Sequence, residues 1–342
     1  MLRRALLVAV VGIALLAGVL LVRTFTNTSR QVAVTPAAPV ALDKDAVARH
    51  LAGAITHKTI SFQAPWEVRG DEFKQFHQYL AETFPKLHAT LKREVVADNA
   101  LLYTWPGSDP AALPIVLLAH MDVVPVDKAS ERDWTHPPFA GEIAEGYIWG
   151  RGAIDDKSSV VSILEATETL LNNGFAPRRT IYFAFGSDEE LGGTTAKAIA
   201  DVLKARQVMA EFTLDEGSCI VQGIVPGVAR PLALMGLGEK GYLTLTLSVK
   251  GEGGHSSQPP AHTAIGILSQ AIVKLENNPL PDRLDGPMLD MLRTAGPEMS
   301  FPMKLVMSNL WLFKPVIMGQ FAKSKTTAAA LHTTTAVTTV SY

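Results

Sequence analysis

Cysteine is almost absent from this sequence, since Cys219 is the only one among 342 residues. The chain therefore forms no intrachain disulfide and offers no cysteine-rich metal site. Runs of Lys and Arg interleaved with aromatic residues are also missing, which argues against a nucleic-acid partner. With 47% hydrophobic residues and a formal net charge of −2, the composition is that of a globular protein long enough for one large domain or two ordinary ones.

Several common catalytic motifs are missing as well. The sequence contains no G-x-S-x-G nucleophile elbow and no H-E-x-x-H zinc helix. One glycine pattern, GLGEKG at residues 236–241, matches the dinucleotide fingerprint G-x-G-x-x-G. That fingerprint must open a helix, whereas an alternating, strand-like stretch follows here. A nicotinamide oxidoreductase is therefore rejected.

The N-terminal region, residues 1–30, contains a run without charged side chains from Ala5 to Val22, preceded by Arg3 and Arg4. Its length suits a single membrane span, and the two arginines favour an N-terminus that stays in the cytoplasm. We expect a membrane anchor with the catalytic part on the non-cytoplasmic side. A cleaved signal peptide, which would give a secreted or periplasmic protein, and a buried core helix are the alternatives.

After a linker at residues 31–44, residues 45–235 alternate between apolar strand-like runs and helical patterns. Helices are expected at 43–56, 72–84, 158–174 and 196–206, and strands at 94–105, 114–120, 180–186 and 211–214. Strands interleaved with helices in this way predict an α/β domain with a mainly parallel sheet.

Residues 236–342 have a different pattern. The stretch at 241–251 alternates as a half-solvated strand does, and residues 262–277 form an amphipathic helical pattern. The tail, residues 326–342, is rich in threonine and has β propensity. A second, α+β domain is expected here.

Histidine and carboxylate residues of the first domain follow the predicted strands. These residues are His120 and Asp122, the acidic triplet 188–190, Asp215 and Glu216, while Asp155 and Asp156 precede a helix. In open α/β sheets the carboxyl ends of the strands line the crevice where ligands bind. Taken singly, each cluster has an ordinary explanation, such as a core histidine, a helix N-cap or a solvated turn. Their joint position predicts a site.

So many carboxylates at one edge repel each other unless a cation compensates. Oxygen ligands alone suit Mg²⁺ or Ca²⁺, but His120 favours zinc or another transition metal. In the pair His120-x-Asp122 the carboxylate suits a role behind the imidazole. Neighbouring Glu189 and Glu190 point differently, so one is expected to bind metal while the other handles protons.

These motifs resemble a known family. LLAHMDVVPV (117–126), PPFAGEIAEGYIWGRGAIDDKSS (137–159), FAFGSDEELGG (183–193) and LDEG (214–217) resemble, in this order, segments of the co-catalytic zinc aminoacylase/carboxypeptidase family, peptidase family M-twenty. The nearest branch is that of carboxypeptidase S and the N-fatty-acyl-amino-acid synthase/hydrolase. Residues 238–260 resemble the start of that family's lid (dimerisation) domain.

The resemblance implies a pair of zinc ions. By it, His120 and Asp215 bind one zinc, Asp155 bridges both, and Glu190 binds the other. The family supplies a last histidine to the zinc of Glu190 from a C-terminal segment that has no counterpart before the sequence ends. We therefore expect a C-terminally truncated chain, incomplete in both domains, with an incomplete second zinc site.

For catalysis the resemblance implies Glu189 as the general base, Asp122 as the residue that orients the histidine, and His255 as a lid residue that polarises the scissile carbonyl. The expected function is hydrolysis of an amide bond in a small peptide or an N-acyl amino acid, and a homodimer through the lid domain is expected. The alternative is a truncated, inactive, membrane-tethered fragment that binds at most one zinc.

Overall fold

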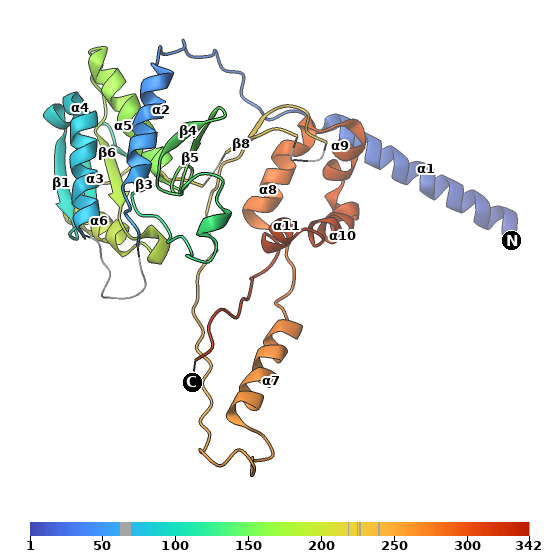
Figure 1. Cartoon of the computed structure of the whole chain (residues 1–342). Coiled ribbons are helices and arrows are strands. Elements are labelled where there is room, and N and C mark those ends of the chain that lie inside the picture. Colours follow the sequence, from blue (N-terminus) through green and yellow to red (C-terminus); the bar gives the residue numbers. More distant parts are fainter. Residues whose placement is uncertain (62–69, 218, 224, 226, 239, 342) are drawn as a thin grey trace. The chain divides into compact units, whose positions relative to one another are not determined.

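The computed structural model describes residues 1–342 except 62–69, 218, 224, 226, 239 and 342. The chain divides into two compact units, which are residues 36–217 and residues 1–35 together with 218–342 (Figure 1). Residue 239 of the rejected glycine pattern and the last residue of the tail lie outside the described residues. The boundaries placed after residues 30, 44 and 235 stay predictions.

The unit of residues 36–217 is built on a sheet whose strands lie in the order β1-β2-β6-β3-β7. The strands are β1 (Lys92–Val96), β2 (Ala100–Trp105), β3 (Ile115–His120), β6 (Ile181–Gly186) and β7 (Phe212–Leu214). β3 pairs in parallel with both β6 and β7, whereas β2 runs antiparallel to β1 and β6. The predicted α/β class is confirmed, and the sheet is mixed, where the sequence led us to expect a mainly parallel one.

The antiparallel part of the sheet begins with a hairpin that the sequence did not reveal. The single strand expected at 94–105 is divided by a turn at residues 97–99, with Val96 opposite Ala100. Ala97 and Asp98 both adopt positive φ, 46° and 68°. Left-handed backbone of this kind matches the twist of a tight hairpin, which can only join antiparallel strands. β1 and β2 are therefore antiparallel because the connection between them is short.

Helices cover both faces of the sheet. On one face, Tyr103, Phe183 and Phe185 pack in one hydrophobic cluster with residues of four helices; on the other face, Leu102 and Ala184 pack with the fifth helix. The four helices are α2 (Lys44–Thr56), α3 (Gly70–Thr83), α4 (Pro85–Thr90) and α5 (Lys157–Asn172), and the fifth is α6 (Thr194–Ala205). Because side chains alternate along a strand, buried strands feed both layers. The result is a three-layer α/β/α arrangement.

Short elements complete this unit. They are the hairpin of β4 (Glu142–Ala144) and β5 (Tyr147–Trp149) and the single turns η1 (Glu131–Asp133) and η2 (Glu189–Leu191). The four helices expected from periodicity all form, with ends within about two residues of the predicted ones. Asp43 shows why α2 starts where it does, since its carboxylate accepts hydrogen bonds from the N–H groups of Asp45 and Ala46.

The other unit is mainly helical. Its elements are α1 (Leu2–Thr26), β8 (Ile220–Val221), β9 (Leu232–Ala233), α7 (Ala264–Asn277), α8 (Gly286–Ala295), η3 (Gly296–Glu298), α9 (Phe301–Ser308), α10 (Leu310–Phe321) and α11 (Lys325–Ala329). Leu284, Leu292, Met307 and Ile317 lie at the centre of its hydrophobic cluster. The expected helix at 262–277 is confirmed as α7.

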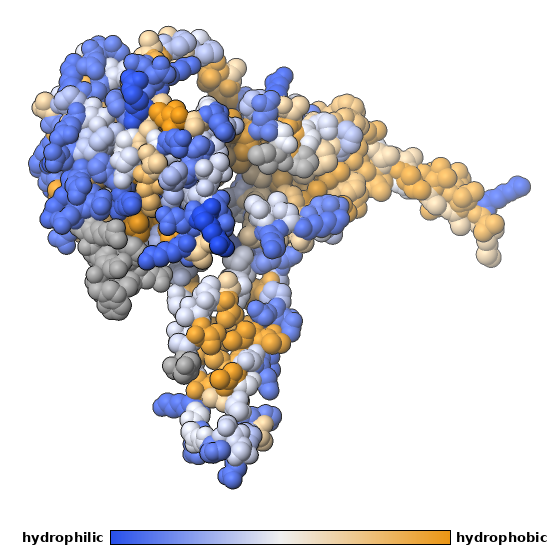
Figure 2. Space-filling view, in the orientation of Figure 1, coloured by the Kyte–Doolittle hydropathy of each residue, from blue (hydrophilic) through white to orange (hydrophobic). Residues whose placement is uncertain are grey.

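Two expectations for this unit are wrong. Residues 241–251 form no strand, and the tail forms the short helix α11 followed by irregular chain rather than β-structure. In the described part of this unit, the strand pairing is limited to β8 with β9, so no neighbouring strand satisfies the backbone of 241–251. α7 likewise keeps apolar side chains exposed, among them Ile265 and Val273. Figure 2 shows a hydrophobic patch on the surface of this helix.

The position of His77 makes the stability of the sheet-containing unit dependent on pH. The His77 ring on α3 is buried, and its Nε2 donates to the carbonyl of Asn99 in the β1–β2 turn at 2.9 Å. Burial lowers the pKa of His77 to about 4. Because the unfolded chain takes up this proton at higher pH, stability is lost as the pH falls from about 6.5 to 4, by about 3 kcal/mol.

We expect His77→Gln, which keeps a side-chain donor for Asn99 but does not titrate, to flatten the loss of stability between pH 6.5 and 4. Urea unfolding at several pH values, followed by tryptophan fluorescence, measures the slope. His262→Gln is the matched control, because His262 is exposed and belongs to the other unit. An unchanged slope in His77→Gln would contradict this assignment.

Candidate functional site

The candidate site lies at the carboxyl ends of the three parallel strands. His120 is the last residue of β3, the acidic triplet 188–190 follows β6, and Asp215 and Glu216 follow β7. Because β3 lies between β6 and β7 in the sheet, the groups that follow the outer strands flank the histidine of the central one. The structure brings His120, Glu189 and Glu190 together at this edge.

His120 is the centre of the cluster and is only 2% exposed. Its Nδ1 lies 3.0 Å from the backbone oxygen of Asp122 and 3.2 Å from the Asp122 carboxylate. Its Nε2 lies 2.9 Å from Asp155 Oδ1 and 3.4 Å from Glu216 Oε1. In the neutral ring with its Nδ1 proton donated to Asp122, the Nε2 lone pair would face the carboxylate cluster, as a metal-binding imidazole requires.

Asp122 connects the histidine to the acidic triplet. Its carboxylate is fully buried and accepts hydrogen bonds from the backbone N–H groups of Glu189, at 3.1 Å, and Glu190, at 3.2 Å. Side-chain spacing alone predicted only its contact with His120. The structure shows a second task, because one buried carboxylate fixes the loop after β6 against the end of β3.

Asp188, for which the sequence suggested no role, anchors the same loop from its other side. Its carboxylate accepts hydrogen bonds from the N–H groups of Thr194, at 3.0 Å, and Thr195, at 2.9 Å, at the start of α6, and from both threonine hydroxyls. Burial alone would raise the pKa of Asp188, but these hydrogen bonds outweigh burial and lower it. Gly192 and Gly193, with φ of 109° and 67°, allow the chain to turn back sharply enough for this contact.

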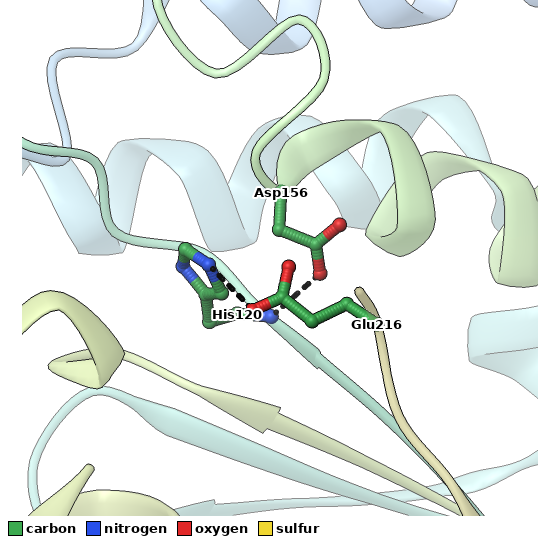
Figure 3. Close-up of side chains that lie close together, drawn as sticks. All are labelled: His120, Asp156 and Glu216. Carbon is green, nitrogen blue, oxygen red and sulfur yellow. Dashed lines mark hydrogen bonds and ion pairs between the residues drawn. The ribbon is translucent and has the colours of Figure 1, made fainter. Parts of the chain in front are cut away.

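Asp156 and Glu216 belong to the cluster although we did not predict them as ligands (Figure 3). Asp156 is 1% exposed and accepts a hydrogen bond from the backbone N–H of His120 at 3.2 Å. Glu216 points from the end of β7 toward the His120 ring (Figure 3). Two triplets bring ligand atoms within 4.8 Å of one another, namely His120 with Asp156 and Glu216, and His120 with Asp155 and Glu190.

Asp215 is not part of either triplet among the described residues. Its side chain is exposed, and its carboxylate accepts a hydrogen bond from the N–H of Glu216 at 2.9 Å. Neighbouring residues of an extended chain point to opposite sides, so only one of the two acids after β7 can face His120. The sequence LDEG carries no signal that tells which one. In the structure Glu216 faces His120, and the role of Asp215 as a metal ligand stays a prediction.

His255 belongs to the other compact unit, where its ring is exposed and its Nδ1 lies 2.7 Å from Ser257 Oγ. Its role on the substrate stays a prediction.

The protonation of His120 reflects the excess of negative charge. Burial by itself lowers the pKa of His120, but the carboxylates of Asp122, Glu216 and Asp156 outweigh burial and raise this pKa to about 10. The histidine therefore attracts a positive charge, either a proton or a metal ion, at every pH near neutrality.

The pKa values of the glutamate carboxylates in the cluster are raised as well. Burial and then repulsion from Asp156 raise the pKa of Glu216 to about 7. Burial also raises the pKa values of Glu189 and Glu190, and neighbouring carboxylates add to the increase while His120 opposes it. Partly withdrawn from water and close together, these groups are destabilised as anions, and a cation would relieve this.

The donor set fits a zinc ion. It combines one imidazole nitrogen with several carboxylate oxygens and has no thiolate, which is a ligand combination used by catalytic zinc. The carboxylates around His120 stabilise the protonated form of its ring. A metal ion bound within either triplet would take the place of that proton.

Comparison with known proteins agrees with this site. The model of peptidase family M20/M25/M40 matches residues 116–308, which is more than half of the chain. The chain belongs to this family. The resemblance predicted from the motifs is thereby confirmed, and the matched range includes every histidine and carboxylate of the cluster.

Relatives within the M20 family include two with informative names. "Probable carboxypeptidase S-like 2" of Dictyostelium discoideum is 44% identical over 341 residues, covering 95% of this chain and 64% of the relative. "N-fatty-acyl-amino acid synthase/hydrolase PM20D1" of Xenopus tropicalis is 38% identical over 339 residues, covering 96% of this chain and 65% of the relative. The chain thus spans slightly less than two thirds of the length of these relatives.

Among solved structures, human carnosine dipeptidase 1 is similar with a TM-score of 0.42 and 19% sequence identity, covering 52% of this chain and 40% of that chain. A likeness of this size has no bearing on function.

The ligand after β7 can be identified by a paired substitution. We expect Glu216→Gln to weaken zinc binding by roughly 10–100-fold or more, because it removes the carboxylate that faces His120. Asp215→Asn, the matched control on the neighbouring residue, should leave the affinity nearly unchanged. Competition with a zinc-chelating dye at neutral pH measures both. The reverse order of effects would restore Asp215 as the ligand.

Proposed function

We propose that this M20 family chain hydrolyses an amide bond next to a free carboxylate, in a peptide or an N-acyl amino acid, with zinc as cofactor. The observation that carries the proposal is the buried His120 amid carboxylates at the carboxyl end of the parallel strands. The substrate class comes from relatives named as a probable carboxypeptidase and as an N-fatty-acyl-amino acid synthase/hydrolase.

The proposed metal ligands are His120, Asp155, Glu190 and Glu216, with Asp155 lying toward both His120 and Glu190 as a bridging carboxylate would. Zinc bound here would lower the pKa of a coordinated water and polarise the scissile carbonyl. The four ligands come from three loops and one strand end, so the loop contacts of Asp122 and Asp188 determine whether the ligands stay together.

Glu189 is proposed as the general base. Its carboxylate lies 3.9 Å from His120 Nε2, its side chain is 52% exposed, and Asp122 fixes its backbone N–H. Burial and the neighbouring carboxylates raise the pKa of Glu189, so it holds a proton more readily than an ordinary glutamate. A base of this kind takes a proton from water and returns it to the leaving amine.

Asp122 is proposed as a positioning residue. It holds the tautomer of His120 and places Glu189 and Glu190 at once, through the contacts described above. His255 is proposed to stabilise the developing oxyanion, from the lid of the same chain or of a second copy in a homodimer.

The helix α1 is proposed as a membrane anchor, with the catalytic unit on the non-cytoplasmic side. α1, Leu2–Thr26, is long and apolar enough to cross a membrane, and its apolar stretch is not buried by the rest of the chain. A signal sequence can have the same length and composition, so a secreted or periplasmic protein is the alternative.

Glu189→Gln tests the mechanism on the full chain. We expect it to keep its zinc and to lose hydrolysis of dipeptides and N-acyl amino acids by roughly 10²–10⁴-fold, because only the proton-transfer group is removed. Glu131→Gln, an equal change of charge at an exposed residue of η1, is the matched control and should stay active. Steady-state kinetics and zinc content per chain are the measurements.

The same measurements decide between the two functional hypotheses. Two zinc ions per chain and turnover that depends on Glu189 exclude the inactive fragment. A wild-type chain with at most one zinc and no turnover would establish it, and a fully active Glu189→Gln would refute the general base.

A further inference from the structure

A cavity of about 590 Å³ lies in the unit of residues 1–35 and 218–342, where the end of α1 meets α8, α9 and α10. None of the predicted site residues lines it. Its lining includes Arg23, Arg30, Arg293 and Lys314.

The wall that α1 contributes is held in place by specific contacts. Asn309, which is fully buried, donates from Nδ2 to the carbonyl of Leu20 at 3.2 Å and to Thr24 Oγ1 at 3.3 Å. Asn27 Nδ2 donates to Ser308 Oγ at 2.9 Å. α1 is therefore joined to the α9–α10 corner by polar contacts with defined partners, and the cavity is bounded on that side by the last turns of α1.

The charges around the cavity are unbalanced. Four cationic side chains line it, and no Asp or Glu is among its lining residues. Arg293 has a carboxylate neighbour, Asp290, at 3.5 Å, and Arg23 Nε donates to the carbonyl of Ser308 at 3.3 Å. Among the described residues, the ion pairs include no partner for Arg30 or Lys314. Cations that converge on one hollow repel each other unless an anion lies between them.

The anion that suits such a lining carries several oxygens. Guanidinium groups present donors in a planar fork that matches phosphate, and an ammonium adds a point charge. The lining also contains apolar side chains, Leu289, Met307 and Leu310, together with the exposed ring of Trp311. A phosphate attached to an apolar body matches both kinds of surface.

The position of the cavity along α1 indicates that the apolar part of such a ligand is a lipid. The apolar run Ala5–Val22 is about 27 Å long at 1.5 Å per residue, close to the thickness of a bilayer's hydrocarbon core. Arg23 follows directly, so in an anchored chain the cavity lies at the level of the lipid headgroups. Tryptophan is favoured at the same level, which suits Trp311.

We propose that this cavity binds the phosphate headgroup of an anionic membrane lipid beside the anchor. The proposal goes beyond amide hydrolysis and does not depend on it. It requires α1 to remain part of the chain, since Arg23 and Arg30 supply half of the positive charge. A bound lipid would hold the helices α8–α10 against the membrane surface.

The test uses the full chain in a neutral detergent, mixed with micelles that contain phosphatidylglycerol or phosphatidylcholine. Native mass spectrometry counts the lipid retained per chain as its mole fraction rises. We expect one phosphatidylglycerol per chain and at least tenfold weaker binding of phosphatidylcholine. The double substitution Arg30→Gln with Lys314→Gln should weaken phosphatidylglycerol binding about thirtyfold, the effect of two positive charges near an anionic surface.

The matched control is Lys323→Gln with Lys325→Gln, an equal loss of charge at exposed residues of the same unit outside the cavity lining. It should bind lipid as the wild type does, and circular dichroism should show the same helix content in all variants. Equal affinity for both lipids, or equal weakening by both double substitutions, would overturn the proposal. Displacement of phosphatidylglycerol by an equal concentration of inorganic phosphate would also overturn it, because the site would then bind free anions.

Discussion

The buried carboxylate of Asp122 is the contact on which the rest of the site depends. It lies against His120 and accepts the N–H groups of Glu189 and Glu190. Two chain segments that are far apart in sequence thereby share one partner. Without a carboxylate here, the backbone N–H groups of Glu189 and Glu190 would lose the buried acceptor that holds their loop against the end of β3. Asp188 supports the same loop by binding the start of α6.

The two units contain charge excesses of opposite sign. In the sheet-containing unit, carboxylates surround a single histidine, and their raised pKa values show that they are destabilised as anions. In the helical unit, four cations surround a hollow whose lining has no acid. Both arrangements are unfavourable in an isolated chain and become favourable when a counter-charge is bound. Each cluster therefore lowers the stability of the unbound chain and favours the binding of a group of opposite charge.

The sequence predicts this molecule well where a signal is local. Periodicity located α2, α5, α6 and α7, and apolar runs located β3 and β6, so the edge on which the polar residues meet was foreseeable. Three features depend on distant or subtle information. The turn at 97–99 has no glycine or proline to mark it, the choice between Asp215 and Glu216 depends on the orientation of β7, and the alternating stretch at 241–251 forms a strand only where another strand pairs with it.

The hydrogen bonds between Asn309 and the end of α1 also have a consequence for proteolytic processing. A membrane anchor that makes no contact with the attached domain can be cleaved without affecting that domain. Here a cut after Thr26 would remove two acceptors of the buried Asn309 amide, leaving it the carbonyl of Leu305 at 2.8 Å, together with the ring of Phe25 that packs on Phe301 at 5.8 Å. The cut would therefore weaken the hydrogen bonding of a buried polar group and expose apolar side chains that α1 contacts. The N-terminal helix is thus a structural part of the helical unit. Its removal would expose apolar surface and make the remaining chain more prone to aggregation.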